Sequence, residues 1–456
     1  MPSLRRLQVT YYLILALFWF ATSLPAALGI LIIQSRGFSL SQAGLFLGIY
    51  SLTIVLLEVP TGGLADAVGR KRVTLAAYAV TALGSASYFF AYSAWAFALA
   101  FMLNGVGRAL ASGALDAWFV DAVQAVDPEI DLQPLLARGG MFSLLALGVG
   151  TLAGSALPML LSGLPADGTA LLTPLTAPIV GAFGCFVLAF VATLLLVRET
   201  RPESEGRGWL DGLRAAPRMV TTAVTLSRRD PTIVLLVSAT MAGAFALLSL
   251  ELLWQPRFAA ILGGSVANTG VANTGMVNTG AGHSAVGNSI VFGVIMAGNF
   301  LAGLVGNGLA PAAGRRLHKR YGLLAALFQA LRGVAMLVLA LQVTLVPAAA
   351  VFWLVYLGMG VVNSPHATLL NRRIPGQYRS AMLSIDSLLG YVGGFFASVL
   401  LGLVAERAGI GLAWGIGGGV LLASALLYVR VDRREQAEST EPVASAWEVA
   451  TAAGEG

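Results

Sequence analysis

The sequence predicts an all-α membrane protein with twelve transmembrane helices in two six-helix repeats. First, 57% of the 456 residues are hydrophobic and only 11% are charged, whereas a soluble domain usually carries about 25% charged residues. Second, the apolar residues form long runs without alternation, which indicates helices and not the strands of a membrane β-barrel. Third, similar motifs recur in the two halves of the chain. The mean hydropathy of +0.80 agrees with a chain solvated mostly by lipid.

Each apolar run is long enough to cross the hydrocarbon core of a bilayer, which takes ~20 residues of helix. The first run is too long for the core of a signal peptide, so we expect it to be retained. The tail at 432–456 is polar and acidic, and we expect it to be disordered. The predicted spans lie near residues 10–34, 41–65, 73–93, 95–124, 136–161, 173–197, 231–255, 287–310, 321–342, 346–370, 378–404 and 410–430.

The positive residues predict the orientation of these spans. With a cytoplasmic N-terminus, 23 of the 28 Lys and Arg residues lie inside, and only Arg36, Arg257 and Arg407 lie outside. The other two, Arg108 and Arg332, lie within spans. Since cytoplasmic loops carry the excess of Lys and Arg, we expect both termini of this multi-pass cell-membrane protein in the cytoplasm. The basic residues lie in loops between apolar runs and not on a soluble face, so nucleic acid is not an expected partner.

The longest basic connection, residues 198–230, predicts a cytoplasmic linker between six-helix bundles at 1–197 and 231–431. The segment 263–286 contains Asn-Thr-Gly three times and predicts an external low-complexity loop. The alternative, a short stacked repeat that caps the external mouth, stays open.

The turn after the second span carries the most specific motif, Gly62-x-Leu64-Ala65-Asp66-x-x-Gly69-Arg70-Lys71. It resembles the signature loop between helices 2 and 3 of major facilitator superfamily transporters. A counterpart at 308–316 keeps the glycines and the basic pair, but Pro311 stands where Asp66 would be. The resemblance implies two related halves that alternate access to a central site. It also implies a gating role for Gly62, Asp66, Gly69, Arg70, Lys71 and Asp121.

The family pattern implies partners for two of these gating residues. Asp66 would meet the N-terminal end of the eleventh helix, near Tyr378 to Met382, where the helix dipole favours an anion. Arg70 would pair with Asp121 at the cytoplasmic end of the fourth helix. Together these contacts would form a latch between the halves.

The fourth span contains Ser112-Gly-Ala-Leu-Asp116-Ala, which resembles a motif of bacterial drug-transporter-like members. The resemblance implies that this span lines the central cavity. Arg108 lies eight residues before Asp116, about 80° around a continuous helix, so we expect each to need another partner. The antiporter signature expected on the fifth span is partial, because Ser155 stands where a proline is usual.

Ionisable residues inside spans usually face a partner or a water-filled path, because an isolated charge in a bilayer is costly. Glu251 has a structural alternative as the partner of Arg257, and Asp386 as the partner of Arg332. The candidates for binding protons or substrate are Glu58, Arg108, Asp116, Glu251, His366 and Asp386.

No nucleotide-binding loop and no cluster of His or Cys residues occurs in the sequence. An enzyme, a cofactor and a metal site are therefore not expected. Transport would instead draw on an ion gradient, most simply of protons, and we expect a monomer.

The first functional hypothesis is proton-coupled export of a lipophilic small molecule. Aromatic residues on spans that line the cavity, such as Trp19 and Trp353, suit such substrates. A proton-coupled importer of a nutrient or metabolite is the alternative, and several polar groups converging in the cavity would indicate it. A non-transporting receptor or scaffold is the third hypothesis.

Overall fold

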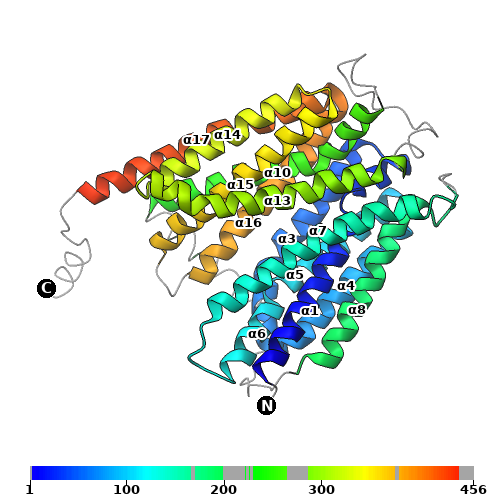
Figure 1. Ribbon diagram of the computed structural model, residues 1–456, viewed down its shortest axis with the longest axis horizontal. Helices are drawn as coiled ribbons and strands as arrows, with labels where there is room; N and C mark the ends of the chain where they lie inside the picture. The colour runs from blue at the N-terminus through cyan, green and yellow to red at the C-terminus, as the bar shows by residue number, and fades with distance from the viewer. Residues whose placement is uncertain are drawn as a thin grey trace.

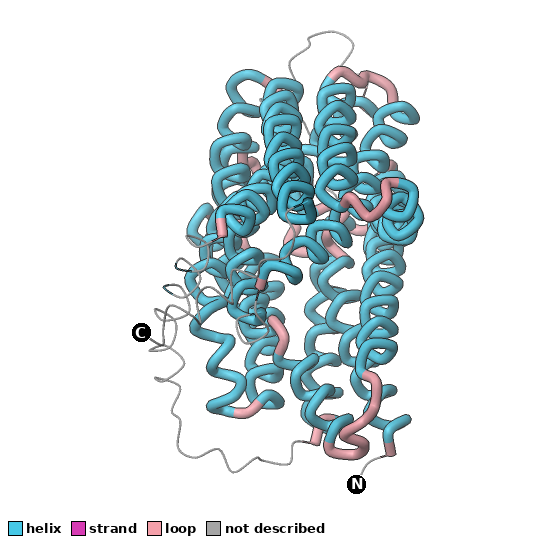
Figure 2. The backbone as a smooth tube through the Cα atoms, turned by 90° about the vertical axis from the view of Figure 1, so that its left-hand side faces the viewer, coloured by secondary structure: helices cyan, strands magenta, loops and turns pink. Residues whose placement is uncertain are grey.

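The computed structural model is helical throughout the residues that it describes and contains no strand among them (Figures 1 and 2). These residues are 3–165, 170–198, 230–263, 286–374 and 379–440, with Thr221 and Thr225. Side chains at 59, 60, 62, 63, 66, 67, 379–381, 439 and 440 lie outside this description. Most of the predicted linker, the low-complexity loop and the end of the tail also lie outside it.

The helices fall into two groups along the chain (Figure 1). The N-terminal group contains α1 (Leu4–Ser23), α2 (Gly29–Ser35), α3 (Leu40–Val68), α4 (Arg70–Phe89), α5 (Ala94–Ala111), α6 (Ala114–Gln124), α7 (Leu132–Leu160), the short η1 (Pro174–Thr176) and α8 (Ala177–Leu196). The C-terminal group contains α10 (Pro231–Leu262), α13 (Ser289–Arg316), α14 (Tyr321–Ala340), α15 (Leu345–Arg373), α16 (Arg379–Ala408) and α17 (Ile410–Thr440).

Within the described chain, ten helical segments are long and apolar enough to cross a membrane. The other two expected spans, α1 and α4, are helices of 20 residues each that pack in the same bundle. They are less apolar because their first turns carry Arg5 and Arg6, and Arg70, Lys71 and Arg72. The prediction of an all-α membrane protein is therefore confirmed.

Two predicted spans are broken, which the hydropathy did not reveal. The first ends at Ser23 and resumes at Gly29, because Pro25 has no N–H to continue the helical ladder. The fourth is interrupted between Ala111 and Ala114, where Gly113 adopts a left-handed conformation with φ of 73°.

The last helix is longer than predicted. We expected disorder from residue 432, but α17 continues to Thr440. Asp432 is buried and accepts a hydrogen bond of 2.5 Å from Arg320, and Glu438 accepts one of 2.9 Å from Arg373. These contacts with α15 and with the start of α14 hold the polar extension against the bundle.

The two groups meet along two helix pairs, α3 with α16 and α7 with α13. Small residues allow the close approach: a Cβ on Gly44 would overlap the Ser398 carbonyl, and one on Gly293 would overlap the Ser155 side chain. Figure 1 shows that the groups converge at one end and splay apart toward the other.

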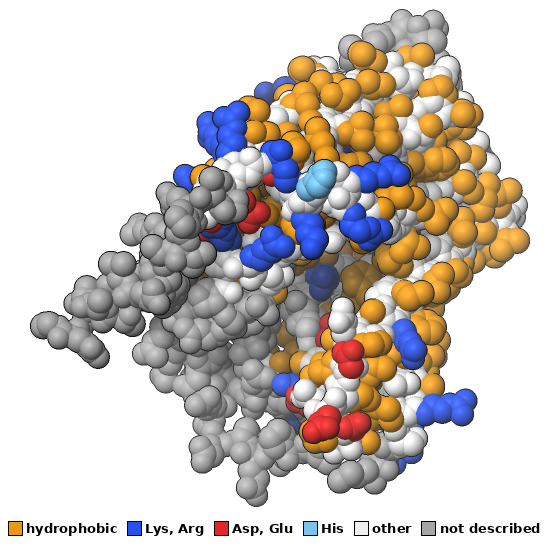
Figure 3. All heavy atoms as spheres, turned by 60° about the vertical axis from the view of Figure 1, so that its left-hand side comes forward, with side chains coloured by type: hydrophobic (Ala, Val, Ile, Leu, Met, Phe, Trp, Pro, Cys, Tyr) orange, Lys and Arg blue, Asp and Glu red, His pale blue; other side chains and the backbone are white. Residues whose placement is uncertain are grey.

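The hydrophobic cores follow the same division. At the joined end, one core contains residues of both groups, including Phe46, Phe97, Trp254 and Leu401. Toward the other end, which we call the open end, separate cores lie inside each group. Figure 3 shows a hollow between the two lobes on this side, rimmed by charged side chains. The groups are therefore packed together at one end only.

Two arginines repeat the same contact in the two groups. Arg36 donates to the carbonyls of Tyr88, Phe89 and Ala91 at the end of α4, at 2.6–2.8 Å. Arg257 donates to the carbonyls of Ala340 and Gln342 at the end of α14, at 3.3 and 2.7 Å. A cation at a helix C-terminus satisfies carbonyls that lack a helical partner. The expected pair of Arg257 with Glu251 is wrong, because these carbonyls occupy the guanidinium.

Candidate functional site

A polar cluster lies between the two groups where α3 and α16 begin to separate. The Ser387 hydroxyl of α16 donates to Glu58 of α3 at 3.1 Å. Arg108 of α5 interacts electrostatically with Glu58 and with the Tyr391 hydroxyl of α16. Tyr50 of α3 also faces Arg108. We call these five residues the inter-group cluster.

The register of α3 against α16 positions the inter-group cluster. The helices run antiparallel, with Gly44 against Ser398, Gly48 against Val399, and Ser51 near Gly394. Continuing in the same direction brings Glu58 opposite Ser387. The contacts at Gly44 and Gly48 are close because glycine has no side chain. The contact at Glu58 instead involves polar side chains, which a solute can contact.

The acid of the inter-group cluster is only partly satisfied. One carboxylate oxygen of Glu58 is buried and has no hydrogen-bond partner. The Arg108 guanidinium also lies 5.7 Å from the ring centre of Trp19 on α1, within cation–π range. An unfilled acceptor, a cation and an aromatic face together can bind a polar solute.

Asp116 belongs to a different contact from Arg108. The Asp116 carboxylate accepts a hydrogen bond of 2.7 Å from the hydroxyl of Tyr11, a buried residue of α1. Asp116 itself is exposed. The break at Gly113 separates it from Arg108, so the calculated angle around one continuous helix does not apply. The structure therefore keeps Asp116 out of the inter-group cluster.

A second polar cluster lies inside the C-terminal group, toward the open end. Thr240 of α10 donates to Asp386 of α16 at 2.6 Å, and His366 Nε2 of α15 lies 3.4 Å from the same carboxylate. His366 Nε2 is also 3.1 Å from the Thr240 hydroxyl, and its Nδ1 is 2.9 Å from the Tyr428 hydroxyl of α17. We call these four residues the His366 cluster.

Arg332 of α14 does not pair with Asp386, so that expectation is wrong. Its guanidinium is buried and donates to Gln329 at 2.7 Å, and Gln329 donates to Ser424 at 2.9 Å. Arg332 also interacts electrostatically with the phenols of Tyr356 and Tyr428. The rotation of α14 relative to α16, which the sequence does not reveal, decides this choice of partner.

Glu251 lies on the other side of Arg332, toward the joined end. Tyr356 of α15 donates a hydrogen bond to its carboxylate. Glu251, Tyr356, Arg332 and the His366 cluster thus form a polar path through the C-terminal helix group. Its ionisable groups in addition to the tyrosines are two carboxylates, one guanidinium and one imidazole.

The turn between α3 and α4 is built as its motif predicts. Gly69 has a φ of 105°, which a residue with a side chain rarely adopts. Arg70 forms an ion pair with Asp121 of α6 and also donates to the Ala117 carbonyl. Lys71 donates to the Leu194 carbonyl of α8 at 2.9 Å. The side chains at positions 62 and 66 lie outside the description, so the contact of Asp66 with α16 stays a prediction.

At the joined end, Gln255 of α10 connects the groups through the break in the first span. Its buried amide donates to the Ala26 carbonyl and accepts from the Ile30 N–H, both at 2.9 Å. In a continuous helix these two backbone groups would bond to each other. Glu406 of α16 adds a link by accepting from the Ser41 N–H in the first turn of α3, at 2.8 Å.

Sequence reasoning missed several of these residues. Gln255, Tyr391, Thr240 and Tyr428 are uncharged polar residues within apolar helices, whereas the candidates chosen for binding protons or substrate were charged residues and one histidine. A signal was present, since a buried amide or hydroxyl in a span also needs a partner. Among the described residues, no group of three His, Cys, Asp or Glu residues is placed to hold a metal ion.

Comparison with known proteins gives matches at the level of family and fold. A family model described as Major Facilitator Superfamily matches residues 11–287. A crystal structure of a point mutant of the nucleoside transporter NupG has a TM-score of 0.69 at 12% identity, covering 93% of this chain and 99% of that one. Another structure of NupG has a TM-score of 0.67 at 14% identity, covering 94% and 99%. Curated proteins include no match to this chain.

Proposed function

Because this chain belongs to the Major Facilitator Superfamily, we propose that it moves a small polar solute across the membrane together with protons. The observation that carries the proposal is the inter-group cluster. Glu58, Arg108 and Tyr50 come from one helix group, and Ser387 and Tyr391 come from the other. A solute bound between them contacts both groups, so its binding is coupled to their relative movement.

The arrangement of the cores supports alternating access. The groups are joined at one end and open at the other. If the open end closes and the joined end opens, the inter-group cluster becomes accessible from the opposite side of the membrane. Arg315, Arg316, Lys319 and Arg372 are exposed at the open end, and positive residues favour the cytoplasmic side. We therefore assign the structure to an inward-open state with both termini in the cytoplasm.

The chemistry of the inter-group cluster favours a polar solute over a lipophilic one. A carboxylate, a guanidinium and three hydroxyls converge there, which is the sign expected of an importer of a nutrient or metabolite. Trp353, one of the aromatics that favoured lipophilic substrates, has another contact, because its indole donates to the Ile295 carbonyl. The fold shared with a nucleoside transporter makes nucleosides the first solutes to test.

The polar path through the C-terminal group supports proton coupling. With His366 neutral, the charges of Glu251, Arg332 and Asp386 add to minus one, so a single proton makes the polar path neutral. Burying a net charge in a membrane is costly, which favours uptake of that proton. The His366 cluster provides the acceptor, because the imidazole of His366 lies 3.4 Å from the Asp386 carboxylate and the two groups can hold one proton between them.

The test is uptake into proteoliposomes that contain the purified full-length protein. Labelled uridine and adenosine are expected to accumulate when a proton gradient is imposed and not when an ionophore dissipates it. Proton-driven movement of the lipophilic cation tetraphenylphosphonium, without movement of nucleosides, would instead support export and the drug-transporter-like branch. Absence of flux and of thermal stabilisation by any solute in a broad panel would favour the receptor or scaffold hypothesis.

Replacing Asp386 by asparagine is expected to lower proton-driven uptake at least about tenfold, because proton transfer groups typically contribute factors of this size or more. Solute counterflow at equal pH, which needs no net proton movement, is expected to continue. Glu438→Gln is the control, because Glu438 is a largely exposed acid of the same helix group. Equal loss of uptake and counterflow in Asp386→Asn would mean a structural role.

Replacing Asp66 by asparagine is expected to lower flux strongly while leaving expression and the melting temperature near normal. The carboxylate is proposed to hold the start of α16 when the open end closes, and asparagine carries no charge to interact with the helix dipole. Glu129→Gln removes an exposed acid from a neighbouring loop and serves as the control. Normal flux of Asp66→Asn in reconstituted vesicles would refute the latch.

A further inference from the structure

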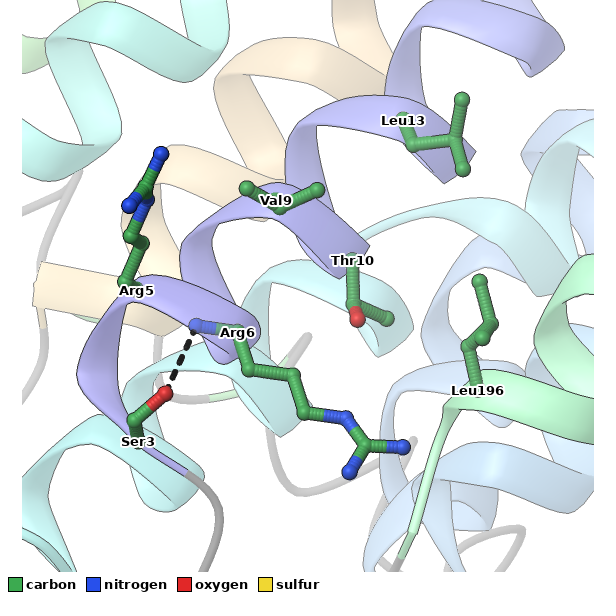
Figure 4. Close-up of a pocket in the computed structure, with 7 residues that line it drawn as sticks. All are labelled: Ser3, Arg5, Arg6, Val9, Thr10, Leu13 and Leu196. Carbon is green, nitrogen blue, oxygen red and sulfur yellow. Dashed lines mark hydrogen bonds between the residues drawn. The ribbon is translucent and has the colours of Figure 1, made fainter.

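An amphipathic groove lies on the outer side of the N-terminal group, away from the inter-group cluster. It has a volume of about 350 Å³ and lies between the start of α1 and the end of α8 (Figure 4). Its lining residues are Ser3, Arg5, Arg6, Val9, Thr10, Leu13 and Leu196. Neither the family match nor the proposed transport reaction assigns a role to it.

One end of the groove is basic. Arg5 and Arg6 are exposed, and no carboxylate within the described chain forms an ion pair with either. Figure 4 shows Arg6 extending toward Leu196, whereas Arg5 lies on the other side of the first turn of α1. No acidic residue lines the groove. The basic end therefore favours an anion through two side chains, independently of the helix terminus, which Ser3 caps at 3.4 Å.

The other end of the groove is apolar and continues into the outer surface of the bundle. Val9 and Leu13 of α1 are 58% and 44% exposed, and Leu195 of α8 is 67% exposed. Such exposure of aliphatic side chains in a membrane protein identifies a lipid-facing surface. The groove thus crosses from the basic first turn to the hydrocarbon-facing surface within about two turns of α1.

We propose that this groove binds an anionic phospholipid. Its phosphate lies against the Arg6 guanidinium, with Arg5 adding positive charge from the other side of the first turn of α1, and one acyl chain lies along Val9, Leu13 and Leu196. Guanidinium groups form charge-assisted hydrogen bonds with phosphate, and basic pockets beside transmembrane helices favour anionic headgroups. A zwitterionic lipid binds less well, because its own cation is not attracted to the two arginines.

The test measures lipid retention by native mass spectrometry of the full-length protein in detergent. Dioleoyl phosphatidylglycerol and dioleoyl phosphatidylcholine are supplied in equal amounts. The unmodified protein is expected to retain the anionic lipid preferentially, and Arg5→Gln with Arg6→Gln is expected to lower the retention ratio about tenfold. The matched control is Arg433→Gln with Arg434→Gln, an exposed basic pair outside the groove.

Two further experiments distinguish lipid binding from the binding of free phosphate and from misfolding of the variants. Leu13→Gln is expected to weaken retention of the anionic lipid, whereas inorganic phosphate and glycerol phosphate are expected not to displace it. Melting temperatures of all variants confirm that each is folded. The proposal is overturned by equal retention of the two lipids, by equal loss in the control pair, or by full displacement with glycerol phosphate.

Discussion

Replacing Arg108 by glutamine is expected to lower solute flux about a hundredfold, because Arg108 interacts electrostatically with Glu58 and its removal leaves the charge of Glu58 uncompensated. Arg108 is the cation of the inter-group cluster, and one Glu58 oxygen already lacks a partner. The substitution also removes the group that Tyr391 of the opposite helix group contacts. Flux of the solute identified in proteoliposomes is the measurement, with solute-dependent thermal stabilisation as a separate readout of binding.

A double-mutant cycle tests whether Arg108 acts through Glu58. Glu58→Gln combined with Arg108→Gln leaves no unpaired charge, so solute binding is expected to recover relative to Arg108→Gln alone. Tyr391→Phe removes one hydroxyl and leaves the charges of Glu58 and Arg108 in place, so it is expected to lower flux less than Arg108→Gln does. Strictly additive effects of the two charge substitutions would exclude a functional pair.

Replacing Gly44 by leucine is expected to abolish flux by forcing the joined end apart. Any side chain at this position overlaps the Ser398 backbone, which cannot rotate away. Interfaces packed through backbone contacts respond by changing arrangement and not by small deformation. The variant is therefore expected to favour a conformation open at the end that is joined in this structure.

Thiol labelling detects this conformational change. In a Cys185→Ser background, Ala397→Cys places a thiol at a fully buried position of the shared core. It is expected to react slowly in the otherwise unmodified protein and at least about tenfold faster with Gly44→Leu, because reaction requires exposure of the thiol. Gly148→Leu is the matched control, since a Cβ there meets no atom within 4 Å. Slow labelling in Gly44→Leu with normal flux would contradict the prediction.

Much of the fold could be predicted from the chain, whereas the composition of the site could not. The Gly69-Arg70-Lys71 motif and Asp121 were expected to lie together, and Arg70 and Asp121 form an ion pair. The candidates Glu58, Arg108, His366 and Asp386 all lie in polar clusters, although their gating, proton and substrate roles stay predictions. The pairs Glu251–Arg257 and Asp386–Arg332 were wrong, because hydropathy does not report how each helix is rotated about its axis.

Breaks within spans show the same limit. Pro25 and Gly113 are visible in the sequence, yet proline and glycine also occur inside unbroken helices here, as Pro158 and Gly150 do in α7. The first break is filled by Gln255, more than 200 residues away in the chain, whose amide bonds to both interrupted backbone groups. A break that needs a partner from another helix group becomes evident only when that partner is in place.

By itself, the sequence determined the all-helical membrane fold, the motif of the turn at 62–71 and the set of ionisable residues within the apolar helices, whereas the relation between its two halves stays a prediction. These properties depend on hydropathy, charge and short motifs, which are local along the chain. Tertiary structure alone decided which polar groups meet: Glu58 with Ser387, Arg108 with Tyr391, and His366 with Asp386. Such pairing depends on the register and rotation of helices far apart in the chain, and close packing through residues such as Gly44 sets both.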